Sequence, residues 1–196
     1  MVKNTDPWVD GIERSRMMAV FLKENLGDLS AKTVLDLGCG FGGISMGLAE
    51  SCGRLYAVDS DQKRVDFLSA RVRDKGYRSV SVVHTDAEVL PFEDSFFDLV
   101  ILNGVLEWSG CGKKIDPRLS QLKVLREVFR VLKKNGTLYL AVENRFFPFN
   151  IFRDPHCRLP FVAILPFKLS DLFSRMLSGR PYETPIYSYY GLKNLL

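Results

Sequence analysis

The chain is poor in the residues that build disulfide scaffolds and metal sites. It holds four cysteines and two histidines in 196 residues, and no two cysteines form a CxxC pair. None of the cysteines stands at metal-ligand spacing from His84 or His156. Disulfide frameworks and zinc sites depend on such paired spacings. We therefore expect no metal site, and a reducing, cytoplasmic environment.

Long apolar runs are also missing. The most apolar stretch, residues 159–167, is interrupted by Pro160 and Pro166 and followed by Lys168. A membrane-spanning helix needs about 20 apolar residues, so the sequence predicts no transmembrane segment. The polar start, residues 1–10, lacks the apolar run of a signal peptide.

Basic and acidic residues nearly balance, so the chain has little net charge. The formal net charge is only +4, whereas nucleic-acid binding usually needs a concentrated basic face. A basic stretch that includes Arg71, Arg73, Lys75 and Arg78 is equally explained as the solvated surface of a helix. We therefore expect no nucleic-acid partner.

Apolar segments and helical patterns alternate along the chain. Short apolar segments at residues 33–37, 54–58, 80–83, 97–102 and 137–142 predict strands, the last entered through a turn at Asn135-Gly136. Helical spacing predicts helices at residues 8–25, 44–50, 62–75 and 119–132. This alternation predicts an α/β fold with a mostly parallel sheet and helices on both faces.

A glycine-rich turn follows the first predicted strand. Gly38, Gly40 and Gly43 match the GxGxxG pattern, while Gly38, Gly40 and Gly42 match the tighter GxGxG spacing. Glycine allows a tight turn and close approach of the backbone to a ligand. Either match alone is a weak signal, and a turn without a ligand would look the same.

An acidic residue, Asp59, ends the second predicted strand. It stands about 20 residues beyond the glycine turn, where nucleotide-binding folds place an acid for the ribose hydroxyls. The alternative is that Asp59 caps the next helix, although Ser60 or Asp61 could do so instead.

Together these segments resemble class I S-adenosylmethionine-dependent methyltransferases, of the methyltransferase-11-like, small-molecule type. The resemblance rests on five motifs in order, at residues 34–42, 56–59, 85–92, 96–103 and 136–140. It implies a Rossmann-like, doubly wound, mostly parallel sheet with strand order 3-2-1-4-5. The usual last two strands of that fold are missing from the sequence.

The resemblance also implies the cofactor, S-adenosyl-L-methionine, with S-adenosyl-L-homocysteine as product. The methionine end would lie against Asp36 and the amides around Gly38 to Gly40, the ribose against Asp59, and the adenine against Asp86. Asp86 is alternatively a turn-forming residue. The full set implied for the cofactor is Asp36, Gly38, Cys39, Gly40, Gly42, Asp59, Ser60, Asp86, Ala87 and Asn103.

Two departures from the family bear on the acceptor. Trp108 stands where the family often has histidine after Leu-Glu, so a base from that point is lost. Asn103 is followed by Gly104-Val105 rather than Pro-Pro, which argues against an adenine or cytosine amino group as acceptor. His156 is the candidate catalytic base, in a segment resembling one from bacterial glycan methyltransferases; a surface-loop histidine is the alternative.

The remaining organisation is expected as follows. Residues 1–144 form the cofactor-binding core, and residues 145–186 form an aromatic, proline-rich insertion or lid with a helix at 169–177. Residues 187–196 begin a further, truncated helix. The shortened sheet would leave an open edge, which suggests a homodimer. The insertion contains the phenylalanines Phe146, Phe147, Phe149, Phe152, Phe161 and Phe167. We expect them to pack against the sheet; the alternative is an interfacial patch that recruits a lipid-linked substrate.

The leading interpretation is methyl transfer to a small-molecule acceptor, on an oxygen of a sugar-, lipid- or quinone-like compound. The first alternative is a catalytically impaired or partner-dependent module that only binds the cofactor. An RNA methyltransferase and a nicotinamide oxidoreductase are further alternatives. Salt-dependent RNA binding and NADH binding would identify them.

Overall fold

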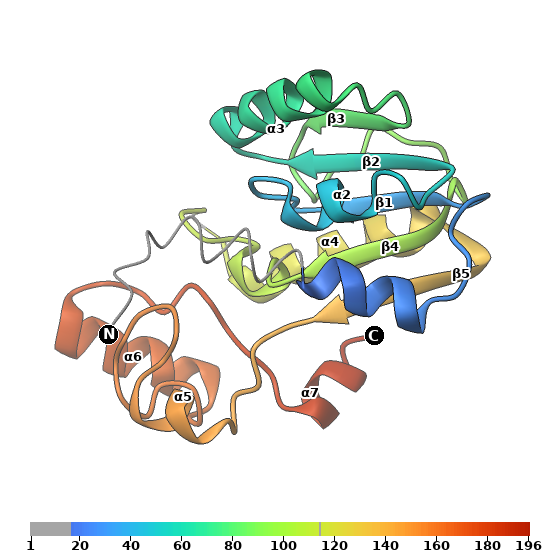
Figure 1. Cartoon of the computed structure of the whole chain (residues 1–196). Coiled ribbons are helices and arrows are strands. Elements are labelled where there is room, and N and C mark those ends of the chain that lie inside the picture. Colours follow the sequence, from blue (N-terminus) through green and yellow to red (C-terminus); the bar gives the residue numbers. More distant parts are fainter. Residues whose placement is uncertain (1–16, 114) are drawn as a thin grey trace, which may run out of the picture. The chain divides into compact units, whose positions relative to one another are not determined.

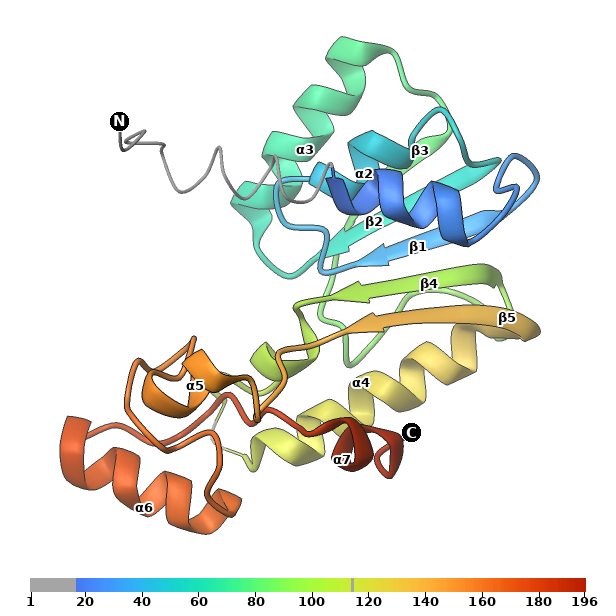
Figure 2. The same cartoon turned by 60° about the horizontal axis from the view of Figure 1, so that its bottom comes forward.

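A five-stranded sheet organises the fold (Figure 1). The computed structural model describes residues 17–113 and 115–196. The strand order is β3-β2-β1-β4-β5. β1 pairs in parallel with β2 and β4, β2 pairs in parallel with β3, and the arrows of β4 and β5 point the same way in Figure 2. The strands are β1 Thr33–Leu37, β2 Arg54–Asp59, β3 Val80–His84, β4 Phe97–Asn103 and β5 Leu132–Ala141. The predicted Rossmann-like fold and strand order are confirmed.

The helices follow the predicted pattern with two additions. Residues 17–25 are helical, and the first nine residues of the helix predicted at 8–25 lie outside the described residues. The additions are the short helices η1 and α5. The elements are α2 Gly43–Leu48, α3 Gln62–Lys75, η1 Leu106–Trp108, α4 Pro117–Val131, α5 Pro148–Phe152, α6 Phe167–Ser178 and α7 Tyr189–Lys193.

The turn predicted at Asn135-Gly136 falls inside the bounds of β5. Helix α4 leads directly into β5, which begins at Leu132 and contains both residues. The backbone bends sharply there, because a Cβ added to Gly136 would lie 3.0 Å from the Lys133 carbonyl oxygen and 2.7 Å from the Leu132 Cδ1. The Phe96 N–H donates to the Val131 carbonyl, just before β5. The predicted tight bend at Asn135-Gly136 is therefore present, although the strand bounds include it.

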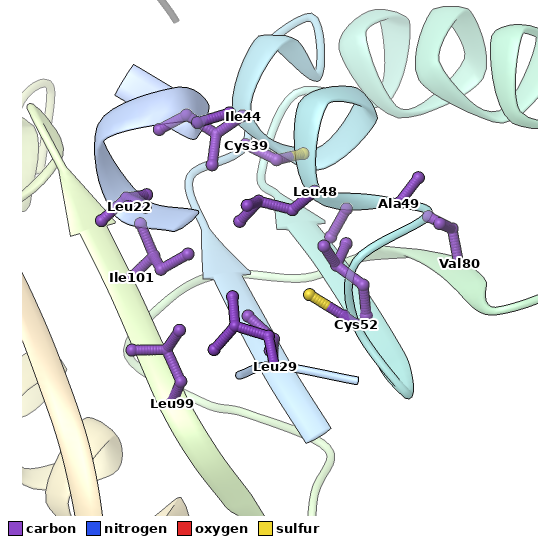
Figure 3. Packing of buried hydrophobic residues seen from close by; sticks show 14 of the residues in the cluster. Leu22, Leu29, Cys39, Ile44, Leu48, Ala49, Cys52, Val80, Leu99 and Ile101 are labelled. Carbon is purple, nitrogen blue, oxygen red and sulfur yellow. The ribbon is translucent and has the colours of Figure 1, made fainter. Parts of the chain in front are cut away.

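A buried apolar cluster joins the sheet to α2, α3 and the helical residues 17–25 (Figure 3). Leu48 of α2 and Leu68 of α3 are fully buried in it, together with Val34 of β1. The next residue of β1, Leu35, is also fully buried. Successive residues of a strand point to opposite faces, so β1 is covered on both.

The chain divides into two compact units. The first, called the sheet unit, comprises the described residues up to 102 together with 127–139; the second comprises 103–126 and 140–196. The predicted insertion and the terminal helix fall within the second unit. The helix predicted at 169–177 is confirmed as α6. The expected packing of the aromatic insertion is wrong for five phenylalanines, which are exposed: Phe146, Phe147, Phe149, Phe152 and Phe161.

Candidate functional site

The glycine turn connects β1 to α2 with a backbone that only glycine adopts readily. Gly38, Gly40 and Gly42 have φ values of 76°, 56° and 78°. A Cβ added to Gly42 would lie 2.1 Å from the Leu68 Cδ1, whereas one added to Gly40 would meet nothing within 4 Å. Gly42 is therefore required for packing against α3. Gly40 borders open space that a ligand could approach.

The amides of the glycine turn donate within the protein. The Gly38 and Cys39 N–H groups donate to the Val58 carbonyl at 2.8 and 2.9 Å. The Gly40 N–H donates to the Asp59 Oδ2 at 2.8 Å. All three donors are thus engaged by β2. The expectation that these amides hold the methionine end of the cofactor stays a prediction.

Asp59 stands at the junction of the glycine turn and the end of β2. Its side chain is buried, and its Oδ1 accepts from the Asp61 N–H at 2.9 Å. The guanidinium of Arg64 lies 3.7 Å from the same oxygen. The alternative role as helix cap is wrong, since the Asp61 carboxylate caps α3 by accepting from the Lys63 and Arg64 amides. Asp59 therefore orients the glycine turn, and its contact with a ligand stays a prediction.

Asp36 serves the interior of the sheet unit. Its carboxyl group is buried, and the Ser45 hydroxyl of α2 donates to the Oδ2. Burial raises the pKa of Asp36 to about 6, against the opposing effect of the Ser45 hydrogen bond. Asp36 therefore ties the end of β1 to the helix that follows the glycine turn.

The residues expected around the adenine and ribose lie after β3 and β2. The Asp86 Oδ1 accepts from the Glu88 N–H at 3.0 Å, so Asp86 does form a turn. The neighbouring Thr85 N–H donates to the Asp59 carbonyl at 3.2 Å, which holds this turn beside the end of β2. Ala87 follows Asp86 within the turn and is partly buried. Ser60 is exposed, and its carbonyl lies 3.0 Å from the His84 Nε2 at the end of β3.

The strand register brings the carboxyl ends of the strands to one edge. Leu37 of β1 lies opposite Val58 of β2 and Leu102 of β4. Asn103, which is partly buried, follows Leu102 as the last residue of β4. Ligands of open α/β sheets bind outside this edge, where the strand order reverses.

His156 is enclosed within the second unit. Its side chain is 6% exposed, so the alternative of a surface-loop histidine is wrong. The ring meets Trp108 edge to face, with centroids 4.7 Å apart. Burial lowers the pKa of His156, while the carboxylates of Asp154 and Glu143 act in the opposite direction. The imidazole is therefore neutral near pH 7 and able to accept a proton.

Asp154 holds the loop that carries His156. It is fully buried, and its Oδ1 accepts from the backbone N–H groups of His156 and Cys157 at 2.9 Å each. The Tyr182 hydroxyl donates to the Oδ2 at 3.2 Å. The His156 Nδ1 lies 3.8 Å from the Asp154 Oδ1 and has no hydrogen-bond partner.

Glu107 is a buried acid that sequence reasoning left without a role. It lies in η1, is 3% exposed, and its Oε2 has no hydrogen-bond partner. Burial raises the pKa of its carboxyl group, and the charge of Glu143 raises it further. Nothing in the sequence next to Trp108 predicts that the Glu107 side chain is buried.

The helices of the described residues are all too short or too polar to cross a bilayer.

Comparisons with known proteins identify the family. A family model described as a methyltransferase domain matches residues 35–140, more than half of the chain. A demethylmenaquinone methyltransferase of Lactococcus lactis is 29% identical over 79% of this chain and 58% of its own length. A malonyl-[acyl-carrier protein] O-methyltransferase of Legionella pneumophila is 33% identical over 56% and 36%, respectively. The chain thus spans only about half the length of curated relatives that it matches.

Solved structures agree on the fold. The YcgJ protein of Bacillus subtilis superposes with a TM-score of 0.63 at 20% identity, over 93% of this chain and 66% of that one. The chain therefore belongs to the methyltransferase domain family, within the class I S-adenosylmethionine-dependent methyltransferases.

Proposed function

We propose that the chain carries out S-adenosylmethionine-dependent methyl transfer to a small-molecule acceptor, on an oxygen of a sugar-, lipid- or quinone-like compound. The proposal rests on the Asp59 carboxylate. It accepts a hydrogen bond from the Gly40 N–H, and Asp61 rather than Asp59 caps helix α3. The names of two relatives, which mention a demethylmenaquinone and an O-methyltransferase, support the acceptor class.

The sheet unit offers groups that suit the cofactor. Asp59, with Ser60 beside it, would accept the ribose hydroxyls, because each carboxylate oxygen can accept more than one hydrogen bond. The open space beside Gly40 would admit the ligand against the backbone. Gly38, Cys39 and Gly42 are proposed to shape the turn, which Asp36 positions through Ser45. Asp86 and Ala87 would border the adenine. Asn103 would border the methionine end.

His156 is proposed as the base for a hydroxyl acceptor. When bound, S-adenosylmethionine supplies an activated methyl group on its sulfonium sulfur. The neutral imidazole of His156 would take the hydroxyl proton as the acceptor oxygen attacks that methyl group. Asp154 would fix the loop through its hydrogen bonds to the backbone, and Trp108 would shield one side of the ring.

Product formation with a panel of hydroxyl-bearing acceptors tests this proposal. We expect His156→Gln to lower kcat by roughly 100-fold or more, the usual contribution of a general base. Cys157→Ala, in the same loop, controls for local disturbance and should retain the rate. Because only neutral imidazole accepts a proton, kcat should fall as the pH drops through a midpoint below the ordinary histidine pKa of 6.5. An unchanged rate in His156→Gln would contradict the assignment.

The enclosure of His156 favours one alternative, a cofactor-binding module that needs a partner for turnover. A side chain with 6% exposure requires a local opening before an acceptor can reach it. The partner could be a second copy at an edge strand of the sheet, β3 or β5. Binding of S-adenosylhomocysteine without turnover by the isolated chain would support this alternative.

A further inference from the structure

Helix α6 buries polar residues and exposes apolar ones. Ser170 and Ser174 are 0% and 1% exposed, whereas Leu172 and Met176 are 55% and 75% exposed. A helix on the surface of a globular domain normally buries its apolar stripe and exposes its polar one. The reversal leaves an unpartnered apolar face.

Hydrogen bonds fix α6 in this orientation. The Ser170 hydroxyl donates to the Val162 carbonyl at 2.7 Å, and the Ser174 hydroxyl donates to the Arg180 carbonyl at 2.9 Å. The Asp171 Oδ1 accepts from the Tyr182 N–H at 3.0 Å. Rotating α6 to bury its leucines would leave these buried polar groups without partners, which is costly. The exposure of the apolar face is therefore built into the second unit.

The exposed residues of α6 form one stripe. Leu169, Leu172 and Met176 are spaced by three and four residues, which places them on the same side of a helix. All three are at least half exposed, and Leu177 extends the stripe at its C-terminal end. We call these four residues the apolar face of α6.

A second exposed apolar element adjoins α6. Figures 1 and 2 both show α5 near α6. The intervening segment links them, because the Phe161 N–H donates to the Ile151 carbonyl of α5 and Val162 accepts from Ser170 of α6. Phe149 and Phe152 of α5 are more than two thirds exposed.

Positive charge accompanies this apolar surface. Residues 145–181 hold six arginines and lysines against two aspartates, and that surplus of four equals the formal net charge of the whole chain. Lys168 and Arg175 belong to α6 itself and are exposed. One of the two aspartates, Asp154, is fully buried. The other, Asp171, pairs with Arg175 at 2.9 Å, so the remaining exposed charges of this segment are basic.

Two further arginines lie beside a surface hollow. Arg153 and Arg158 line it together with Asp154 and Pro155. The Asp154 carboxylate is occupied by backbone amides and the Tyr182 hydroxyl. Among residues 17–113 and 115–196, no ion pair engages either guanidinium. Guanidinium groups bind phosphate through bidentate hydrogen bonds.

We propose that the second unit docks onto the surface of an anionic phospholipid bilayer. The apolar face of α6 lies among the headgroups and upper acyl chains, while Lys168 and Arg175 contact lipid phosphates, and Arg153 and Arg158 bind a headgroup phosphate in their hollow. Apolar residues combined with basic side chains on a short helix match the chemistry of such an interface. The proposal is independent of methyl transfer.

Sedimentation of the chain with vesicles tests the proposal. The vesicles contain phosphatidylcholine alone or with 30 mol% phosphatidylglycerol, as about a third of the lipid. We expect binding to the anionic vesicles that weakens at least fivefold when salt rises from 0.05 to 0.5 M, roughly the range over which charges become screened. Inorganic phosphate at millimolar concentration should not compete appreciably, because it lacks the apolar contribution.

Matched variants separate the two contributions. Leu172→Gln with Met176→Gln should reduce binding at least tenfold, while Val20→Gln, an apolar residue of the sheet unit that is also 55% exposed, should leave it unchanged. Arg153→Gln with Arg158→Gln should reduce the preference for anionic vesicles, of which Lys168 and Arg175 retain a part, and Lys134→Gln should not change it. Circular dichroism confirms that each variant is folded.

Three outcomes would overturn the proposal. The first is a folded, monomeric chain that does not bind anionic vesicles. The second is equal binding to neutral and anionic vesicles, because it would remove the role of the basic residues. The third is a concentration-dependent dimer that Leu172→Gln with Met176→Gln dissociates, since the apolar face would then be an interface between two copies.

Discussion

The two units differ in how they treat buried polar groups. In the sheet unit, the Asp36 carboxyl group accepts a hydrogen bond from the Ser45 hydroxyl. The Asp59 carboxylate accepts hydrogen bonds from the Gly40 and Asp61 N–H groups. The second unit holds every buried side-chain polar atom without a partner that occurs among the described residues: Glu107 Oε2, Ser120 Oγ, Arg145 Nε and His156 Nδ1. Such atoms are rare in folded proteins and call for an explanation in each case.

The exposed apolar residues follow the same division. Most of the large apolar side chains that are exposed belong to the second unit, including Phe149, Phe152 and Met176. The sheet unit exposes fewer large apolar side chains, among them Val20 and Val89. The second unit has unpartnered groups in its interior and exposed apolar residues on its surface, which fits the acceptor and lipid binding that we propose for it.

Substitution of the glycines gives the largest expected effect in the sheet unit. Gly42→Ala places a Cβ 2.1 Å from the buried Leu68 Cδ1 at a φ of +78°. We expect the free energy of unfolding to fall by roughly 3 kcal/mol, the sum of overpacking and left-handed strain. Gly40→Ala meets nothing within 4 Å and should lose only about 1 kcal/mol. Urea unfolding measures both, and equal losses would contradict the packing role assigned to Gly42.

The raised pKa of Asp36 predicts a pH dependence of stability. Asp36 has a pKa of about 6 when folded and 3.8 as its ordinary value, so the folded state holds more protons between these pH values. Stability is then lost as the pH rises from 3.8 to 6. Between pH 3.5 and 7, Asp36→Asn should gain stability relative to the wild type by at most about 3 kcal/mol, from about 1.4 kcal/mol per pKa unit.

Asp98 supplies the control of opposite sign. Its burial is outweighed by the Thr33 N–H and by Lys133, so the pKa of Asp98 is lowered. Asp98→Asn should therefore lose stability at neutral pH, and the loss should shrink as the pH falls through the lowered pKa of Asp98. A flat difference between Asp36→Asn and the wild type across this range would show that the Asp36 carboxyl group is not buried as described.

Two buried serines give the smallest and most direct contrast between the units. Ser45 and Ser120 are both fully buried, but only Ser45 has a hydrogen-bond partner. Ser45→Ala removes the donor from buried Asp36 and should cost about 1–3 kcal/mol. Ser120→Ala removes an unpaired hydroxyl and should change stability by less than about 0.5 kcal/mol. A large loss in Ser120→Ala, measured by urea unfolding, would reveal a partner for that hydroxyl.

Much of the sheet unit could be predicted because its local signals agree. Val65, Leu68 and Val72 have helical spacing, and Gly76 ends α3 with a left-handed φ of 67°, as glycine allows. The apolar run of β4 is buried along its length. At the Asn135-Gly136 pair the start of the strand differs from the prediction: β5 begins at Leu132, before the tight bend at Gly136.

The second unit was less predictable because its determinants are distant in sequence. The serines of α6 are buried only because carbonyls at Val162 and Arg180 accept from them, and no periodic pattern announces this. Likewise, the burial of His156 depends on Trp108 and Asp154. The competition between Asp59, Ser60 and Asp61 for the helix cap could be stated from sequence, but only backbone geometry decides it.

The central claim is that the edge formed by the glycine turn and Asp59 binds S-adenosylmethionine. Calorimetric titration with S-adenosylhomocysteine tests it most directly, with Asp59→Ala as the variant and Asp66→Ala, an exposed acid of α3, as the charge-matched control. We predict micromolar binding that Asp59→Ala weakens at least tenfold, about 1.4 kcal/mol, and that Asp66→Ala leaves unchanged. Binding of NADH in place of S-adenosylhomocysteine, or equal affinity in Asp59→Ala, would contradict the account.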